Sequence, residues 1–169
     1  GREAHAERLV GGLLGDKEGG RCFHLTRLRN KKYGGKWRTV REALLPGYVF
    51  VVTDEPEQLY RELKKKAPGC GLLDDGGGSA ATLGDGEADF MEKISGGGSK
   101  AGEIPLSLVE VGEDGKAAVL SGPLLSAGGR VRKIDLHRRT AEGAAELMGP
   151  KTVVYLGVEF KDGERRRRC

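Results

Sequence analysis

The chain has 169 residues, a formal net charge of +4 at pH 7, 37% hydrophobic residues and three widely separated cysteines. This length can bury one ordinary core or two small ones, and no apolar run approaches the roughly 18 residues of a membrane span, so we expect a soluble, cytoplasmic protein. An odd number of scattered cysteines without a Cys-x-x-Cys pair argues against a disulfide framework and against a thiolate zinc site.

The first 66 residues predict two helices that flank strands. Residues 2–14 place Ala6, Leu9, Val10, Leu13 and Leu14 at helical spacing. Residues 54–66 begin with Asp and end with three Lys, so their charges complement a helix dipole. Residues 21–28 alternate in part, which indicates a strand. The run at 44–52 is apolar and rich in β-branched and aromatic residues behind a Pro-Gly turn, which predicts a buried strand.

Between these strands, residues 27–38 predict a basic turn. It interleaves Tyr33 and Trp37 with six cations, of which four are candidate nucleic-acid-binding residues: Lys31, Lys32, Lys36 and Arg38. Cations with aromatics can grip a nucleic-acid backbone and stack on bases. A hairpin tip that is only solvated explains the same pattern equally well.

The middle of the chain is loop-like and the last third predicts strands. Gly-Gly-Gly-Ser occurs at 76–79 and at 96–99, which indicates flexible loops around a short helix at 87–94, or an engineered splice. Short strands are then expected at 109–111, 117–120, 129–135, 141–147 and 152–160, a pattern typical of a small β-barrel. The strand at 141–147 is rich in Ala and Gly, which weaken strands, and the four Arg at 165–168 predict a disordered tail.

The positive charge is concentrated in this last third. Residues 121–169 contain eleven Lys or Arg against six Asp or Glu, a net +5, whereas the first 120 residues sum to −1. The densest cationic group comprises Arg130, Arg132, Lys133, His137, Arg138 and Arg139. On a strand, Arg130 and Arg132 share one face while Val131 turns inward, and outward guanidinium groups suit phosphate and RNA. Ordinary surface charge is the alternative interpretation.

The sequence offers no catalytic pattern. The three His are scattered, no nucleophile pattern or His-Glu-x-x-His motif occurs, and the Gly-rich stretches lack the Lys-Ser/Thr of a phosphate-binding loop. No His, Cys and carboxylate cluster has metal-ligand spacing. We therefore expect a protein that is not an enzyme and that binds neither a cofactor nor a metal.

Several motifs occur in an order that narrows the choice of family. They are Gly-Arg-Glu at 1–3 before a helix, Leu-Leu-Pro-Gly-Tyr-Val-Phe-Val-Val at 44–52, residues 104–106 before a strand, Ser-Gly-Pro-Leu at 121–124, Gly-Arg-Val-Arg-Lys-Ile-Asp at 129–135 and Gly-Val-Glu at 157–159. Together they resemble the NusG-type family of transcription elongation and antitermination factors. Residues 123–139 and 156–160 look most similar to the LoaP branch, which comprises specialised antitermination paralogues.

The resemblance implies an α+β protein of two domains. Residues 1–108 would form an NGN-like domain, an antiparallel sheet flanked by helices, and residues 109–162 a KOW domain, which is a small SH3-like β-barrel; residues 163–169 would be the disordered basic tail. Family members begin with a strand that is absent here, so we expect a fragment whose natural start lies upstream. Without that strand, backbone groups and an apolar face of the sheet would be exposed.

The resemblance also implies partners. The NGN-like domain would bind the clamp helices of RNA polymerase through an apolar concavity, and Leu45, Tyr48 and Phe50 match positions at and around that strand. Because side chains alternate on a strand, Tyr48 and Phe50 would share one face, which we favour as the lining of the concavity. The KOW domain would meet a second partner, such as nascent RNA with a leader hairpin as one candidate, a ribosomal protein or a termination factor. We expect a monomer without membrane contact.

Three functions follow from this resemblance. The first is a processive antitermination factor of the LoaP kind that binds polymerase and contacts RNA through its basic surfaces. The second is a general NusG-like factor that couples polymerase to the ribosome or to a termination factor. The third is a ribosome-associated KOW protein with a structural RNA-binding role.

Overall fold

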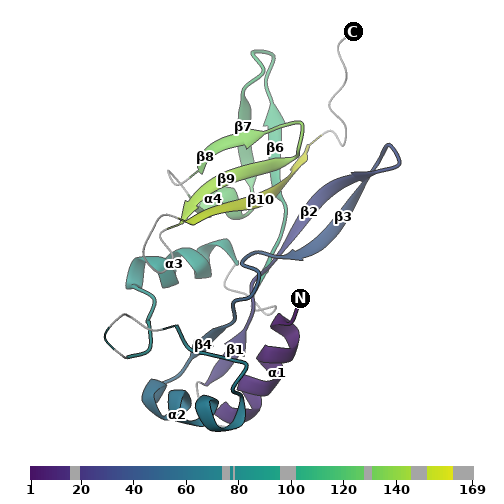
Figure 1. Ribbon diagram of the computed structural model, residues 1–169. Helices are drawn as coiled ribbons and strands as arrows, with labels where there is room; N and C mark the ends of the chain where they lie inside the picture. Colours follow the sequence, from purple (N-terminus) through teal and green to yellow (C-terminus); the bar gives the residue numbers. More distant parts are fainter. Residues whose placement is uncertain are drawn as a thin grey trace. The chain divides into compact units, whose positions relative to one another are not determined.

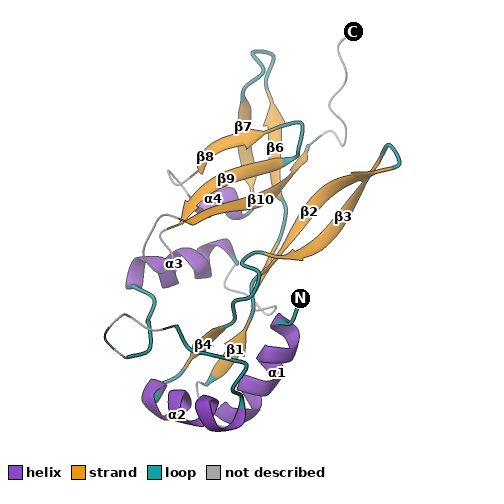
Figure 2. Cartoon of the chain, in the orientation of Figure 1, coloured by secondary structure: helices purple, strands orange, loops and turns teal. Residues whose placement is uncertain are grey.

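The computed structural model describes residues 1–15, 20–73, 77, 79–95, 102–127, 131–145 and 152–161. These residues form a mixed α+β structure, whose helices and strands are labelled in Figures 1 and 2. The chain divides into two compact units, one of Gly1–His24 with Leu45–Gly84 and one of Leu25–Leu44 with Asp85–Cys169. This grouping cuts across the domain boundary expected at residue 108, which stays a prediction. Among the helices of the described residues, none is long and apolar enough to span a membrane.

The first unit packs two helices and a short antiparallel sheet around one small core. Its elements are α1 (Glu3–Leu14), β1 (Arg21–Phe23), β4 (Phe50–Val52) and α2 (Pro56–Lys66). The predicted helices are thus confirmed, and Pro56 starts α2 because its fixed φ suits the first helical position. The core residues are Val10, Leu14, Leu59, Leu63 and Ala67.

The strand expected at 44–52 is much shorter than predicted, since only Phe50–Val52 form β4. Gly47 has a φ of 89°, and the Tyr48 N–H donates to the Leu45 carbonyl at 3.2 Å, so Leu45 to Tyr48 form a turn. Pro46 also lacks the N–H that a sheet ladder needs. The apolar composition predicts one strand, whereas the Pro46-Gly47 pair breaks the segment in the middle.

The second unit contains a long hairpin and a five-stranded sheet. The hairpin comprises β2 (Thr26–Tyr33) and β3 (Lys36–Ala43), and β5 (Glu103–Ile104) pairs parallel with β2. The expected turn at 27–38 is therefore wrong: the chain turns only at Gly34 and Gly35, whose φ values of 53° and 80° fit a tight two-residue hairpin. The expected single antiparallel N-terminal sheet is likewise replaced by β1–β4 and by the separate three-stranded sheet β3-β2-β5.

The five-stranded sheet has the order β7-β6-β10-β9-β8. Its strands are β6 (Ser107–Val111), β7 (Ala117–Ser121), β8 (Val131–Asp135), β9 (Thr140–Ala145) and β10 (Thr152–Phe160). The predicted strands are confirmed within the described residues, including the Ala-rich β9, where Ala141 is fully buried between β8 and β10. The Gly129 end of β8, residues 146–147 and the basic tail lie outside the described residues.

Two short helices complete the second unit. Helix α3 (Asp85–Ile94) confirms the helix expected at 87–94 and buries Phe90, Met91 and Ile94. Helix α4 (Pro123–Ala127) was not expected. It follows Gly122, whose φ is 93°, and the Leu124 N–H donates to the buried Ser107 hydroxyl at 3.0 Å. The Ser-Gly-Pro-Leu motif therefore forms a helical turn that packs next to β6.

The hairpin lies directly against β10. The Asn30 side-chain amide donates to the Val158 carbonyl at 3.1 Å, and the Arg27 guanidinium donates to the Tyr155 carbonyl. Between these two bonds sits Gly157. A Cβ atom there would overlap the Leu28 carbonyl oxygen and lie 3.1 Å from the Arg29 Cα atom. Only glycine allows β2 and β10 to come this close.

Gly157→Ala should therefore destabilise the protein by about 1–3 kcal/mol, because the added methyl group meets backbone that cannot move aside. Urea unfolding would measure the change. Gly143→Ala in β9 is the matched control, since a Cβ there would lie 3.4 Å from a Val154 methyl group and 3.8 Å from the Val154 carbonyl oxygen, without overlap. Equal stability of the two variants would contradict the close packing of β2 on β10.

Candidate functional sites

The hairpin has two faces of different character. Cross-strand partners share a face, and side chains alternate along each strand. One face carries Leu28, Asn30 and Trp37 and packs toward β10. We call the other the outer face. It consists of Arg27, Arg29, Lys31 and Tyr33 on β2 and Lys36, Arg38, Val40 and Glu42 on β3.

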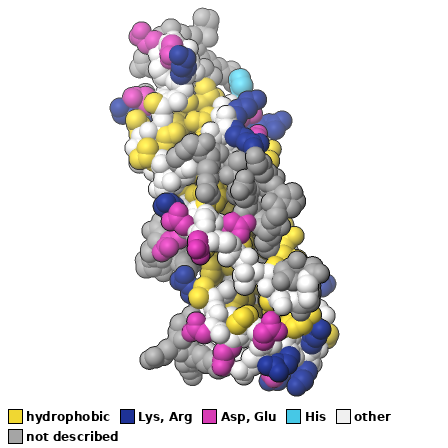
Figure 3. Space-filling view, turned by 90° about the vertical axis from the view of Figure 1, so that its left-hand side faces the viewer, with side chains coloured by type: hydrophobic (Ala, Val, Ile, Leu, Met, Phe, Trp, Pro, Cys, Tyr) yellow, Lys and Arg dark blue, Asp and Glu magenta, His cyan; other side chains and the backbone are white. Residues whose placement is uncertain are grey.

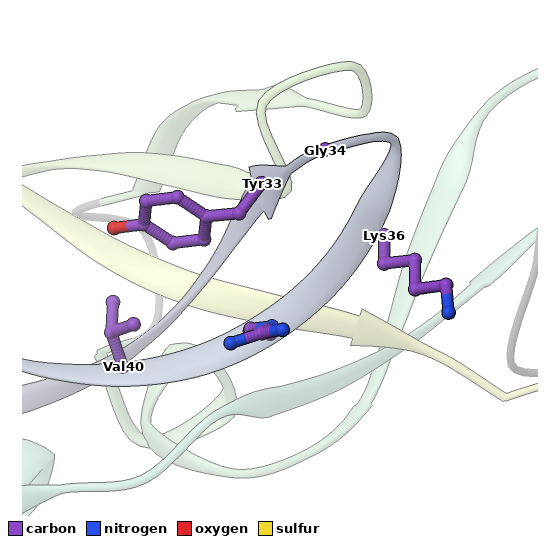
Figure 4. A pocket seen from close by; sticks show the side chains of 5 residues that line it. Tyr33, Gly34, Lys36 and Val40 are labelled. Atoms are coloured by element: carbon purple, nitrogen blue, oxygen red, sulfur yellow. The ribbon is translucent and has the colours of Figure 1, made fainter.

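The outer face combines charge with an exposed aromatic ring. Lys36 and Arg38 are exposed, and Tyr33 exposes 51% of its surface. Around them lies an open hollow lined by Tyr33, Gly34, Lys36, Arg38 and Val40; Figure 4 shows Tyr33 and Lys36 beside the Gly34 turn and Val40 further along the hairpin. Five cations face a single carboxylate here, so this face suits a polyanion with planar groups.

Glu42 is held among three of these cations. Its Oε2 atom lies 3.7 Å from Nη2 of Arg27 and 3.7 Å from Nη1 of Arg29, and its Oε1 atom accepts a bond from the Lys31 ammonium. The Lys31 bond is the main cause that lowers the pKa of Glu42. Burial, together with the charge of Arg29, lowers the pKa of Arg27.

Arg139, expected to bind nucleic acid, has a different position. Its guanidinium lies 4.3 Å from the centre of the Trp37 ring and 5.0 Å from that of Phe160, and the residue is only 7% exposed. Its φ of 51° is unusual for a residue other than glycine. The structure therefore uses Arg139 to join the hairpin to the five-stranded sheet, with little of its surface left for a ligand.

The other predicted cations of this group are exposed, namely Arg132, Lys133, His137 and Arg138. Strict alternation was expected to put Arg132 and Lys133 on opposite faces, but the register shifts between Val131 and Lys133. A bulge of this kind places two consecutive residues opposite one partner residue, which explains why both are exposed. Arg130 lies outside the described residues.

Asp135 orders the turn that follows β8. Its carboxylate accepts the Arg138 N–H at 2.9 Å, and this bond is the main cause that lowers the pKa of Asp135. The turn places His137 and Arg138 immediately before Arg139, which contacts the hairpin at Trp37. On the face shown in Figure 3, Lys and Arg side chains gather beside a His side chain. The contact between Arg139 and Trp37 thus joins the cations that follow β8 to those of the hairpin, about 100 residues away in sequence.

The sequence alone does not assign the hairpin cations to faces, whereas the strand register does. Lys31, Lys36 and Arg38 belong to the outer face, whereas Lys32 pairs with Trp37 on the opposite face. Arg27, Arg29 and Glu42 were not selected, although they belong to the same face as Lys31. The Gly34-Gly35 pair between two alternating segments was the signal that could have found this arrangement.

The three candidate polymerase-binding residues differ in exposure. Tyr48 is 40% exposed and Leu45 is half-buried, but Phe50 is 8% exposed and stacks on Phe23 with ring centres 5.9 Å apart. Tyr48 lies outside β4, so the expected alternation with Phe50 does not apply. Tyr48 can meet a partner directly, whereas Phe50 supports the surface from inside.

Glu3 fixes the turn that carries Tyr48. Its carboxylate accepts the Gly47 N–H at 2.8 Å. This bond is the main cause that lowers the pKa of Glu3 to about 2. The Glu of the Gly-Arg-Glu motif thus links the start of α1 to the Pro-Gly turn, which explains why two distant motifs occur together.

The described residues contain no group of three or more His, Cys, Asp or Glu that could hold a metal ion. Cys22 and Cys70 are free thiols packed against the core of the first unit. Burial is the main cause that raises the pKa of Cys22 to about 11, so its thiol is protonated at neutral pH. This environment is that of a core cysteine rather than an activated nucleophile.

The described residues thus form a mixed α+β protein in which a basic hairpin lies next to a five-stranded sheet. A curated relative defines it further. Over 128 residues the chain is 30% identical to the transcription termination/antitermination protein NusG of Thermus thermophilus, and the match covers 73% of this chain and 68% of that protein. No protein-family model matches the chain. The chain belongs to the NusG family of transcription termination and antitermination factors.

The role of Arg139 can be tested through Trp37, which is the single tryptophan of the chain. Arg139→Gln should lower the stability by about 1–2 kcal/mol and shift Trp37 emission to longer wavelength, because the cation that covers the ring is lost. Arg138→Gln is the control, since that side chain is 79% exposed. Unchanged emission in Arg139→Gln would show that Arg139 does not hold the hairpin.

Proposed function

We propose that this protein is a transcription elongation factor that binds RNA polymerase and promotes processive antitermination, as a member of the LoaP branch. The relationship to NusG carries the proposal, because it extends over two thirds of a protein named for termination and antitermination. The motifs at 123–139 and 156–160 support the specialised branch. Helix α4 and strand β10 are the elements that contain much of these motifs.

In this proposal the polymerase clamp helices meet the surface around Tyr48. Leu45 and Tyr48 lie on the turn that Glu3 holds through Gly47, so the turn is already ordered before a partner binds. Phe50 follows this turn in β4, where it is buried and stacks on Phe23. The domain assignment follows the family: residues 1–108 as the NGN-like domain and residues 109–162 as the KOW barrel.

The basic surfaces contact RNA in this proposal. On the hairpin, Lys31, Lys36 and Arg38 share the outer face with Tyr33, a combination that suits phosphates and a stacked base. On the sheet, the exposed cations are Arg132, Lys133, His137 and Arg138. Binding should weaken steeply with salt, because each phosphate that a cation neutralises releases counterions.

A general NusG-like factor is the second candidate, since the relative is named for termination as well as antitermination. Such a factor would couple polymerase to the ribosome or to a termination factor without selecting its targets. A ribosome-associated KOW protein, the third candidate, would retain ribosomal RNA but ignore polymerase.

Tyr48→Ala should weaken polymerase binding by about tenfold, as expected for an exposed aromatic residue at the centre of an interface. RNA binding should be unchanged. A pull-down with purified RNA polymerase measures the first effect and a filter-binding titration with RNA the second. Tyr155→Ala is the matched control because Tyr155 has a similar exposure of 45%.

If Tyr48→Ala retains full polymerase binding, the proposed polymerase surface is wrong. Retention of ribosomal RNA by a wild-type protein that fails to bind polymerase would instead favour the ribosome-associated candidate. Phe50→Ala does not serve this test, since removal of a buried ring stacked on Phe23 destabilises the fold itself.

Antitermination can be separated from general NusG activity by its dependence on a leader. In single-round transcription, the protein should increase read-through of a terminator only on templates that carry a leader hairpin upstream. Read-through that is equal with and without the leader would contradict the LoaP assignment and favour the general factor. Arg38→Ala combined with Arg132→Ala should abolish the leader-dependent effect while polymerase binding persists.

A further inference from the structure

The base of the hairpin's outer face holds one carboxylate and three cations. Arg27, Arg29 and Lys31 occupy alternate positions of β2, so they point to one side at intervals of about 7 Å. Glu42 on β3 contacts all three. It is the one acidic residue of the sequence between Thr26 and Ala43. A local excess of two positive charges therefore remains.

Glu42 satisfies these cations incompletely, although the Arg27 guanidinium also donates to the Tyr155 carbonyl of β10. The two guanidinium contacts of 3.7 Å are ion pairs but exceed hydrogen-bond length. The Nε atoms of Arg27 and Arg29 are buried and have no hydrogen-bond partner among the described residues. A carboxylate offers two oxygens, of which one is taken by Lys31. A phosphate group accepts paired bonds from guanidinium groups and matches the donor set better.

We propose that Glu42 is an internal competitor for backbone phosphate at this position and thereby limits the affinity of the outer face for RNA. This inference rests on the proposed RNA contact and specifies how that contact is regulated. When RNA binds, a phosphate replaces the Glu42 carboxylate among Arg27, Arg29 and Lys31. The bond from Lys31 lowers the pKa of Glu42 and so favours the charged carboxylate that this competition requires.

The position of Glu42 divides the outer face into two parts. Toward the turn, Lys36 faces Tyr33 and Arg38 faces Lys31, with no acidic residue on either strand there. At the base, Arg27 and Arg29 are engaged with Glu42. RNA therefore meets the tip first, and only a strand long enough to reach the base displaces the carboxylate. Anions too short to reach the base contact only the tip and therefore bind less tightly.

The direct test is the affinity of full-length Glu42→Gln for a fluorescently labelled single-stranded RNA, measured by anisotropy over a range of salt concentrations. Glu42→Gln should bind about threefold more tightly than wild type, since one ion-pair competitor is removed. Its log–log salt dependence should steepen by about 0.7, which corresponds to one additional phosphate of a single strand.

Glu103→Gln is the matched control. Glu103 forms an ion pair with Arg41, which lies on the opposite face, and its side chain is 21% exposed against 25% for Glu42. Both variants raise the net charge by one. A gain confined to Glu42→Gln supports the proposal, whereas an equal gain in both variants shows a general charge effect and overturns it.

Further outcomes are equally decisive. If Glu42→Gln melts at a lower temperature than wild type, Glu42→Thr replaces it, because threonine favours strands. Unchanged or weaker RNA binding by a folded variant overturns the proposal. If neither wild type nor variant binds RNA, both this inference and the RNA contact fail, while the polymerase pull-down still tests the rest of the proposed function.

Discussion

The close approach of β2 to β10 is the constraint on which the second unit depends. It requires glycine at position 157, because any side chain there would overlap the Leu28 carbonyl. Asn30 and Arg27 then donate to carbonyl groups of β10, and Arg139 fills the space between Trp37 and Phe160. One face of the hairpin is thereby covered, and its cations other than Lys32 and Arg41 are presented on the outer face.

Local patterns predicted most of the elements but not their limits. Helical spacing and charge located α1 and α2, and short apolar runs located the strands of the five-stranded sheet. The composition of residues 44–52 predicts one long strand, but Pro46 and Gly47 form a turn, so that only Phe50–Val52 form a strand. The basic segment at 27–38 predicts a turn, whereas the structure turns only at Gly34 and Gly35 and pairs the residues on either side as β2 and β3.

The candidate site was predicted as a set of charges rather than as a surface. The sequence shows where the cations are, but the pairing register of the strands decides which of them share a face. The bulge at Arg132 shifts the register of β8 and so exposes both Arg132 and Lys133. Arg139 shows the limit most clearly: its stacking partners, Trp37 and Phe160, are distant in sequence. The competition at Glu42 is similarly invisible until the pairing of β2 with β3 is known.

The chain belongs to the NusG family. Two of its surfaces, the turn that carries Tyr48 and the outer face of the hairpin, are the proposed contacts for its partners. The first unit presents Tyr48 on a turn held by Glu3, and the second presents cations on a hairpin held by β10. The two surfaces belong to separate compact units. The proposed polymerase contact and the proposed RNA contact are therefore tested by substitutions in different units.

The central claim is that the hairpin and β10 form one cooperative unit. Native-state amide hydrogen exchange, followed residue by residue, measures this most directly. We predict that the hydrogen-bonded amides of β2 and those of β10 exchange through an opening of the same free energy. Exchange of β2 through a much lower-energy opening, while β10 stays protected, would contradict it.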